Sequence, residues 1–413
     1  MISFDEALHK ILASVTSLGW EEKKILDCLG QVSAADIAAP FNVPAYANSA
    51  MDGYAVRAAD VKNASAAKPA VLKVKGEVPA GIFPRMKVGA SQCVRIMTGG
   101  IIPRGADTVI PVEATDFESR KNARNKLDSI GITEPLKRGS HIRRAGEDVV
   151  DGELILAKGM LLRSAEIGVL ASLGMSKIKV IRRPVVAILA TGSELISTRA
   201  KLTPGKLYNS NTYSIASQVR EFGGVPKILG VAKDKMNSLT SALARGLDSD
   251  LMVTTGGVSV GEYDMVKNVM KSEGRMNFWR VRMKPGRPLA YGTFNRVDGG
   301  TVPHLGLPGN PVSCMLDFEL FGRPLILKLM GRSDLERPMV SAILENDVVN
   351  SDGRRIFARV RIQQRKGKYY ARLTGAQGSG ILTSMVKANA LAIIPETEKE
   401  ARKGEVVNVI MLN

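Results

Sequence analysis

The most restrictive feature of the sequence is a short apolar run that ends in a pair of glycines. Residues 251–254 read Leu-Met-Val-Thr, which has the length and β-branched character of a buried strand. Gly256 and Gly257 follow, and adjacent glycines let the backbone approach a ligand closely or take a positive φ. A helical pattern resumes after Asp264. Strand, glycine loop and helix start together form a geometry that points backbone N–H groups at an anion.

Acidic residues in the same loop indicate a cation as well. Glu262 and Asp264 would repel a phosphate group unless a metal ion lay between them and the phosphate. The stretch therefore suggests a phosphate ligand bound with Mg²⁺. Taken by itself, a tight turn with Asp264 in the first turn of the helix explains the loop at least as well.

The order of strand, loop and helix recurs throughout residues 181–331. Strands are expected at 185–190, 225–231, 251–254, 278–283, 289–294 and 304–307, and helices at 214–222, 236–247 and from 312 to about 331. This alternation predicts a doubly wound α/β domain. Ligands of such domains bind beyond the carboxyl ends of the strands, where the loops 191–194 and 256–264 lie.

The rest of the chain is organised in shorter elements, and 413 residues are too many for one ordinary core. Ser3 and Glu6 form a capping box that begins an amphipathic helix, and a second helix is expected over 22–37. Short strands between Gly and Pro residues predict β structure elsewhere. We expect four domains: a helical and mixed linking domain (1–43 with 140–180), a small β domain (44–139), the α/β domain (181–331) and a β-barrel-like C-terminal domain (332–413).

Composition narrows the class of protein without settling its partner. The net charge of +18 would suit nucleic acid, but the basic residues are spread along the chain without a long Lys/Arg block. An anionic small molecule or simple solubility accounts for them equally well. The apolar runs are too short to span a bilayer, and nothing resembles a signal peptide. We therefore expect a soluble cytoplasmic protein with no nucleic-acid or membrane partner.

Two arginines of one predicted strand share a face. In residues 356–362 apolar side chains alternate with Phe357, Arg359 and Arg361. A period of two places both arginines on the same side of the strand. The ordinary interpretation is a strand whose polar face meets solvent.

Several motifs that are modest alone occur together in a distinctive order. As a set they resemble the molybdopterin molybdenumtransferase family, which includes the C-terminal domain of gephyrin, and the resemblance covers nearly the whole chain. The motifs are Asn48-Ser49-x-Met51-Asp52-Gly53-Tyr54-Ala55, Met97-Thr98-Gly99, Arg144-x-Gly146-Glu147-Asp148, Thr191-Gly192-x-Glu194-Leu195, Gly256-Gly257-Val258-Ser259-x-Gly261-x-x-Asp264, Lys284-Pro285-Gly286-x-Pro288 and Leu307-Pro308-Gly309-Asn310-Pro311-Val312-Ser313.

The resemblance implies an activity and partners. The family takes adenylylated molybdopterin and molybdate, cleaves the phosphoanhydride in a Mg²⁺-dependent step, releases AMP and leaves molybdenum on the dithiolene. It also implies a homodimer of four-domain subunits, in which the molybdopterin-binding α/β domain of one chain faces the β domain of the other. A molybdopterin adenylyltransferase would supply the substrate.

The resemblance also implies roles for individual residues. Catalytic roles fall to Asp52, Asp148, Glu194, Asp264, Lys284 and Arg287, and of these Glu194 and Asp264 would hold Mg²⁺. Substrate contacts fall to Thr98, Asp234, Gly256, Gly257, Ser259, Pro288, Pro308, Asn310, Ser313, Arg359 and Ser379. Arg359 and Ser379 match an anion position of the last domain, where a tetrahedral oxyanion such as molybdate would lie. Charged donors and a bound cation suit these anionic substrates.

Two departures from the family pattern affect the predicted oxyanion and metal sites. Arg287 replaces the lysine of many members, and its planar donor fork differs from an ammonium group. Ser193 stands where many members have aspartate, which removes one carboxylate from the predicted metal site. A tungstate-inserting homologue and a non-catalytic pterin-binding scaffold are the alternatives to the molybdate-inserting enzyme.

Overall fold

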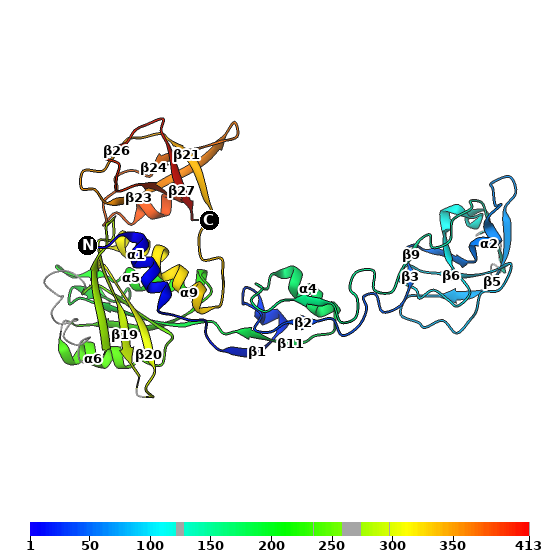
Figure 1. Cartoon of the computed structure of the whole chain (residues 1–413), viewed down its shortest axis with the longest axis horizontal. Helices are drawn as coiled ribbons and strands as arrows, with labels where there is room; N and C mark the ends of the chain where they lie inside the picture. Colours follow the sequence, from blue (N-terminus) through cyan, green and yellow to red (C-terminus); the bar gives the residue numbers. More distant parts are fainter. Residues whose placement is uncertain (121–127, 234, 258–273, 297, 413) are drawn as a thin grey trace. The chain divides into compact units, whose positions relative to one another are not determined.

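The computed structural model describes residues 1–120, 128–233, 235–257, 274–296 and 298–412 (Figure 1). Three predicted site residues, Asp234, Ser259 and Asp264, lie outside the described residues. Contacts divide the chain into two compact units. The first comprises Met1–Ala34, Gly159–Arg163 and Lys177–Asn413, and the second comprises Ala35–Lys158 and Ser164–Ser176. The four-domain division stays a prediction.

The first unit is built on a six-stranded sheet. Its order is β15 (Val225–Ala232), β12 (Val185–Thr191), β16 (Leu251–Thr255), β20 (Thr301–Leu307), β19 (Pro288–Asn295) and β17 (Gly274–Arg280). The first four strands are parallel, whereas β19 and β17 are antiparallel to their neighbours. The carboxyl ends of β12, β16 and β20 therefore meet at one edge of the sheet.

Helices cover both faces of this sheet, which confirms the predicted α/β fold. Within β12, Val186 and Ile188 belong to one apolar core while Ala187 and Leu189 belong to another. Such double burial explains why the strand reads as a continuous apolar run. The first core includes residues of α1 (Phe4–Ala13), α5 (Asn211–Glu221), α8 (Pro311–Asp317) and α9 (Arg323–Leu329), and the second includes residues of α6 (Met236–Ala244). A π-helical turn, η3 (Phe318–Gly322), joins α8 to α9.

The C-terminal strands close into a five-stranded barrel, as the sequence predicted. The strands pair in the order β23 (Arg355–Arg365), β24 (Lys368–Leu373), β21 (Met339–Leu344), β27 (Val406–Met411) and β25 (Ala390–Ile394), and β25 pairs again with β23. The short strand β18 (Met283–Lys284) of the α/β region pairs in parallel with β23. This pairing ties the Lys284 loop to the barrel.

The predicted helix over 22–37 is wrong. The segment forms β1 (Trp20–Lys24), a 3-10 turn at Ile25–Cys28 and β2 (Ile37–Ala38). β1 pairs antiparallel with β11 (Lys177–Ile181), and β2 pairs with β10 (Leu154–Leu156). Because the pairing partners lie far along the chain, the local helical pattern is overridden by tertiary contacts.

The second unit contains a five-stranded sheet. Its order is β7 (Thr108–Pro111), β4 (Gly53–Val56), β6 (Gln92–Ile96), β5 (Ala70–Val78) and β8 (Ser129–Ile132). A separate two-stranded ribbon pairs β3 (Asn48–Ser49) with β9 (Ile142–Arg143). The unit also contains α4 (Ser164–Ser172).

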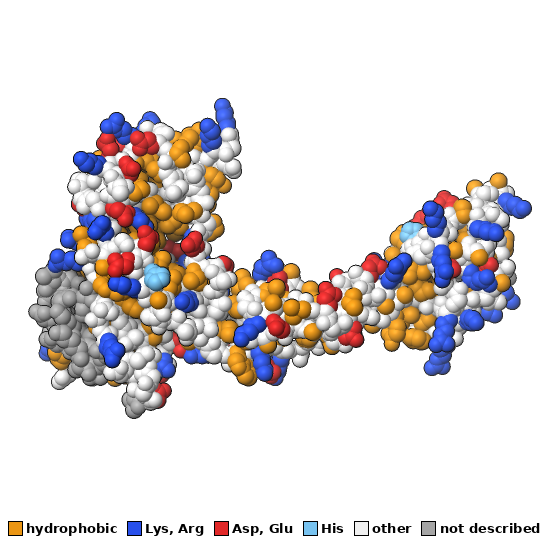
Figure 2. Space-filling view, in the orientation of Figure 1, with side chains coloured by type: hydrophobic (Ala, Val, Ile, Leu, Met, Phe, Trp, Pro, Cys, Tyr) orange, Lys and Arg blue, Asp and Glu red, His pale blue; other side chains and the backbone are white. Residues whose placement is uncertain are grey.

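The surface of the described chain is basic but mixed. Figure 2 shows Lys and Arg side chains over both units on the face in view, with Asp and Glu among them. In the part of the chain that the structure describes, no helix has the length and apolar character needed to cross a membrane.

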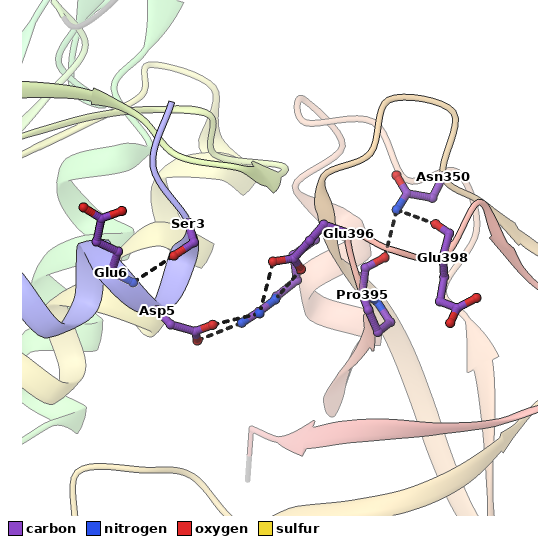
Figure 3. Close-up of polar contacts among 8 residues, drawn as sticks. Ser3, Asp5, Glu6, Asn350, Pro395, Glu396 and Glu398 are labelled. Atoms are coloured by element: carbon purple, nitrogen blue, oxygen red, sulfur yellow. Dashed lines mark hydrogen bonds and ion pairs between the residues drawn. The ribbon is translucent and has the colours of Figure 1, made fainter.

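An ion network joins the N-terminal helix to the barrel. Ser3 Oγ accepts a hydrogen bond from the backbone N–H of Glu6 at 3.1 Å, as the capping box predicts. Arg355 of β23 then donates to both carboxylate oxygens of Asp5 at 2.9 and 2.8 Å, and to Glu396 at 3.0 and 3.3 Å (Figure 3). Helix α1 and two segments of the barrel are thereby held at one guanidinium group.

Candidate functional site

A cavity of about 570 Å³ opens at the carboxyl end of the parallel strands. It is lined by Thr191 at the end of β12, by Thr255 at the end of β16 and by the loop that follows β20. Seven residues predicted from the sequence line it: Glu194, Gly256, Gly257, Pro288, Pro308, Asn310 and Ser313. The structure therefore brings together motifs that are more than 100 residues apart in the chain.

The glycine loop crosses directly over the end of the neighbouring strand. Gly256 has a φ of +87°, and a Cβ atom there would lie 2.6 Å from the carbonyl oxygen of Thr191. Its backbone N–H donates to the carbonyl of Leu307 at 3.0 Å. Glycine is required at this position because both the conformation and the close approach exclude a side chain.

Glu194 supplies the single carboxylate among the described residues that line the cavity. A Cβ atom at Gly192 would lie 2.6 Å from each of its carboxylate oxygens, so the carboxylate folds back against that glycine. The backbone around it is fixed by pairing of β13 (Leu195–Ile196) with β14 (Leu207–Tyr208). The side chain of Glu194 is exposed and available to a ligand.

This carboxylate is compatible with a bound Mg²⁺ ion. Mg²⁺ commonly takes one or two protein carboxylates and completes its shell with water and substrate phosphate oxygens. The described residues contain no group of three or more His, Cys, Asp or Glu side chains placed to hold a metal.

Sequence reasoning missed the wall formed by β14 and the start of α5. Leu207, Tyr208, Asn209 and Asn211 all line the cavity. Asn209 Oδ1 accepts the backbone N–H of Thr212 at 3.2 Å, and Asn211 Nδ2 donates to the carbonyl of Gly309 at 2.8 Å. The capping residues before α5 were the available signal. The predicted helix began at residue 214, three residues after its observed start.

The Lys284–Pro288 loop reaches the cavity at one end only. Pro288 lines the cavity, whereas Lys284 and Arg287 lie outside its lining. Lys284 is half-exposed, with its Nζ atom 3.9 Å from Asp352 Oδ2, and Arg287 is exposed. Both cations are therefore accessible to an anion.

Arg359 and Ser379 lie where the barrel meets α8. Arg359 is only 1% exposed, and burial lowers the pKa of its guanidinium group. It donates to Ser384 Oγ and to the carbonyl of Gly378, both at 3.1 Å. The carbonyl of Ser379 accepts the backbone N–H of Val312, one residue before Ser313 of the cavity.

The interpretation of β23 as a strand with one solvent-facing side is wrong for Arg359, although it holds for Arg361, which is exposed. The side of the strand that carries Arg359 is covered by other elements. Phe357 packs in the core of the α/β region, and Ser384 belongs to α10 (Thr383–Lys387). Alternation along the sequence does not reveal such a cover.

In the second unit, the structure brings Asp52 and Thr98 together. Asp52 Oδ1 accepts the backbone N–H of Thr98 at 2.7 Å and its hydroxyl at 2.8 Å. These hydrogen bonds, the backbone one first, lower the pKa of Asp52. Asp148 lies on an exposed turn of the same unit, where its backbone N–H donates to the carbonyl of Val43 at 3.0 Å.

Comparison with protein families finds three consecutive matches. Residues 2–174 match the MoeA N-terminal region (domain I and II), residues 187–328 match a probable molybdopterin binding domain, and residues 341–412 match the MoeA C-terminal region (domain IV). Together they span most of the chain. All the described residues that line the cavity lie within the second of these regions.

Relatives and solved structures agree with these matches. The chain is 37% identical over 387 residues to molybdopterin molybdenumtransferase 2 of Mycobacterium tuberculosis, with 92% of each chain covered. It is 33% identical over 417 residues to the molybdopterin molybdenumtransferase of Haemophilus influenzae, with 100% and 99% covered. A structure of the molybdopterin biosynthesis MoeA protein from Pyrococcus horikoshii has a TM-score of 0.83 at 32% identity and covers 100% of this chain and 99% of that one.

Proposed function

Because the chain belongs to the molybdopterin molybdenumtransferase (MoeA) family, transferases of molybdenum cofactor biosynthesis, we propose that its cavity binds adenylylated molybdopterin. There the phosphoanhydride is cleaved in the presence of molybdate, AMP leaves, and molybdenum passes to the dithiolene. The observation that carries the proposal is the convergence of four family motifs on one cavity, in which Glu194 supplies the carboxylate. A volume of about 570 Å³ suits a small-molecule substrate.

In this proposal, charged residues in and beside the cavity neutralise the negative charge of the two anionic substrates. Glu194 and the predicted Asp264 would hold Mg²⁺, which when bound neutralises phosphate charge and makes the phosphoanhydride easier to break. Lys284 and Arg287 bind molybdate, the second anionic substrate, since both side chains are accessible. Arg287 offers a two-pronged donor to an oxyanion in place of a point charge.

We propose that the start of α8 and the loop beneath it form the rest of the molybdate site, next to the Lys284–Pro288 loop that α8 contacts through Asp317. Ser313 lines the cavity, and the adjacent Val312 is bonded to Ser379. Arg359 supports this loop from below through Gly378. Its role here is to hold the loop and to add positive potential, because a guanidinium group that is 1% exposed has little surface for direct contact.

The second unit completes the site in a homodimer. We propose that Asp52, Thr98 and Asp148 of one subunit face the cavity of the other, and that a molybdopterin adenylyltransferase delivers the substrate in the cytoplasm. The Asp52–Thr98 contact supports this, because it holds a carboxylate in its ionised form on an exposed surface.

The decisive experiment measures AMP release from adenylylated molybdopterin with Mg²⁺, in the presence and absence of molybdate. Wild type should release AMP in a molybdate-dependent manner, and Glu194→Gln should lower the rate by about a hundredfold because one carboxylate is lost from the site. Asp264→Ala should do the same. The matched control is Glu336→Gln, an exposed glutamate of the same unit outside the cavity lining, which should leave the rate unchanged.

Other outcomes would point to the alternatives. Tight nucleotide binding without release by wild type, with every variant equal to it, would favour the pterin-binding scaffold. Release that depends on tungstate but not on molybdate would identify the tungstate-inserting homologue.

A further inference from the structure

One buried carboxyl group in the structure has no visible function in the reaction proposed above. Asp317, the last residue of α8, is 0% exposed, and neither of its carboxylate oxygens has a hydrogen-bond partner among the described residues. Burial raises the pKa of Asp317 well above its usual range, because the charged form is disfavoured away from water. An unpaired buried polar group opposes folding, and its presence requires an explanation.

The Asp317 carboxyl group lies directly against the middle of the Lys284–Pro288 loop. A Cβ atom at Gly286 would lie 1.7 Å from Asp317 Oδ1 and 2.6 Å from Cγ. Gly286 also has a φ of +95°. The carboxyl group therefore occupies the space that a side chain at position 286 would need.

The flanks of this loop are held by main-chain bonds, whereas its middle lies against Asp317. On one side Lys284 pairs with Ile356 of the barrel through β18 and β23. On the other side the backbone N–H of Val281 donates to the carbonyl of Arg287 at 2.8 Å, and β19 begins at Pro288. No described backbone hydrogen bond involves Gly286 itself.

The helix that carries Asp317 also lines the cavity. Asn310 precedes α8 and Ser313 lies in its first turn, and both belong to the cavity wall. Asp317 lies one turn after Ser313 on the same helix. One rigid element thus connects the cavity wall to the underside of the cationic loop.

We propose that Asp317 is a positioning residue, whose carboxyl group holds Gly286 in place and thereby sets where Lys284 and Arg287 meet an anionic ligand. This inference rests on the proposed function, in which these two cations bind molybdate. The carboxyl group provides bulk directly beneath the loop, where it fills the space next to Gly286.

The test measures the binding of inorganic molybdate to the full-length protein by calorimetry. Asp317→Ala should weaken binding about tenfold or more, because the loop relaxes into the vacated space and small displacements of a binding group are costly. Asp317→Asn keeps the shape and volume of the side chain and should bind within about threefold of wild type. Cys314→Ala is the matched control, since Cys314 is also 0% exposed on α8 and its truncation removes buried volume from the same helix without emptying the space beside Gly286.

A second pair of variants tests the contact itself. Gly286→Ala should weaken molybdate binding because its Cβ atom collides with Asp317. Adding Asp317→Ala should make the double variant bind better than the product of the two separate losses predicts, because the collision is removed.

The outcomes separate this inference from the proposed function. Absence of molybdate binding by wild type would overturn both. Four results would overturn the role of Asp317 alone. Two concern Asp317→Ala: molybdate binding as tight as that of wild type, or a loss of affinity no greater than that of Cys314→Ala. The other two are a loss of affinity in Asp317→Asn as large as that in Asp317→Ala, and strictly independent losses at positions 286 and 317.

Discussion

His304 shows how a single buried side chain makes stability depend on pH. It lies in β20, fully buried, and its Nε2 atom is 2.9 Å from Thr254 Oγ1. Burial lowers the pKa of His304 from 6.5 to about 3, so the folded protein keeps the ring neutral. The unfolded chain takes up a proton near pH 6.5, which favours unfolding at lower pH. The contribution of His304 to stability is therefore present above pH 6.5 and is lost progressively as the pH falls toward 3.

This linkage gives a prediction for urea unfolding at pH 7.5 and pH 5. We expect wild type to lose about 2 kcal/mol of unfolding free energy through His304 over this interval. His304→Gln should remove that part of the pH dependence, whereas His9→Gln, at an exposed position, should leave it unchanged. Equal slopes in wild type and His304→Gln would contradict the prediction.

At the scale of elements, the hydrogen-bonded ion network of Arg355 fixes α1 to the barrel. Arg355 is 21% exposed and Glu396 20%, whereas Asp5 is 68% exposed. The partly buried pair should contribute more than the exposed one, because water screens the latter. Hydrogen bonds to Arg355 also lower the pKa of Glu396 against the opposing effect of its burial.

We accordingly expect Arg355→Ala to lower the unfolding free energy by about 1–3 kcal/mol, since it leaves Glu396 without its partner. Asp5→Asn should lower the unfolding free energy by less than about 1 kcal/mol. The control Arg365→Ala should also lose less than about 1 kcal/mol, because the exposed ion pair of Arg365 with Glu345 lies within the barrel region and does not link it to α1. Chemical denaturation at low and high salt checks the ranking. A larger loss in Asp5→Asn than in Arg355→Ala would show that the exposed pair dominates.

At the scale of the whole molecule, the proposed homodimer predicts complementation between inactive subunits. Glu194→Gln damages the cavity, and Asp52→Asn damages the surface proposed to face it from the other subunit. In a mixed dimer one of the two sites is intact, so a randomly assembled equimolar mixture should recover about a quarter of wild-type AMP release. Activity that stays at the level of the separate variants would place both residues in one subunit's site or exclude the dimer. The control is a mixture of Glu194→Gln with Glu336→Gln. Half of its cavities keep Glu194 whether or not the subunits exchange, so its activity reports dilution of active protein and not complementation.

Several features of the fold followed from local sequence alone. Apolar runs such as 185–190 and 251–254 identified buried strands, because a strand covered on both faces tolerates few polar residues. The glycines at 256 and 257, at the end of one such strand, located the edge of the sheet where the cavity opens. The resemblance to the family added individual residues, seven of which line that cavity.

Only the tertiary structure decided the features that depend on distant partners. Residues 20–38 form strands and not a helix because their pairing partners lie more than 100 residues away. Arg359 is buried because another layer covers its side of β23, and alternation along one strand carries no information about a second layer. The burial of His304 and Asp317 arises in the same way, since burial is a property of packing among elements. Sequence periodicity therefore determined which elements form and where their polar loops lie, while long-range packing decided which charged groups are covered, paired or left neutral.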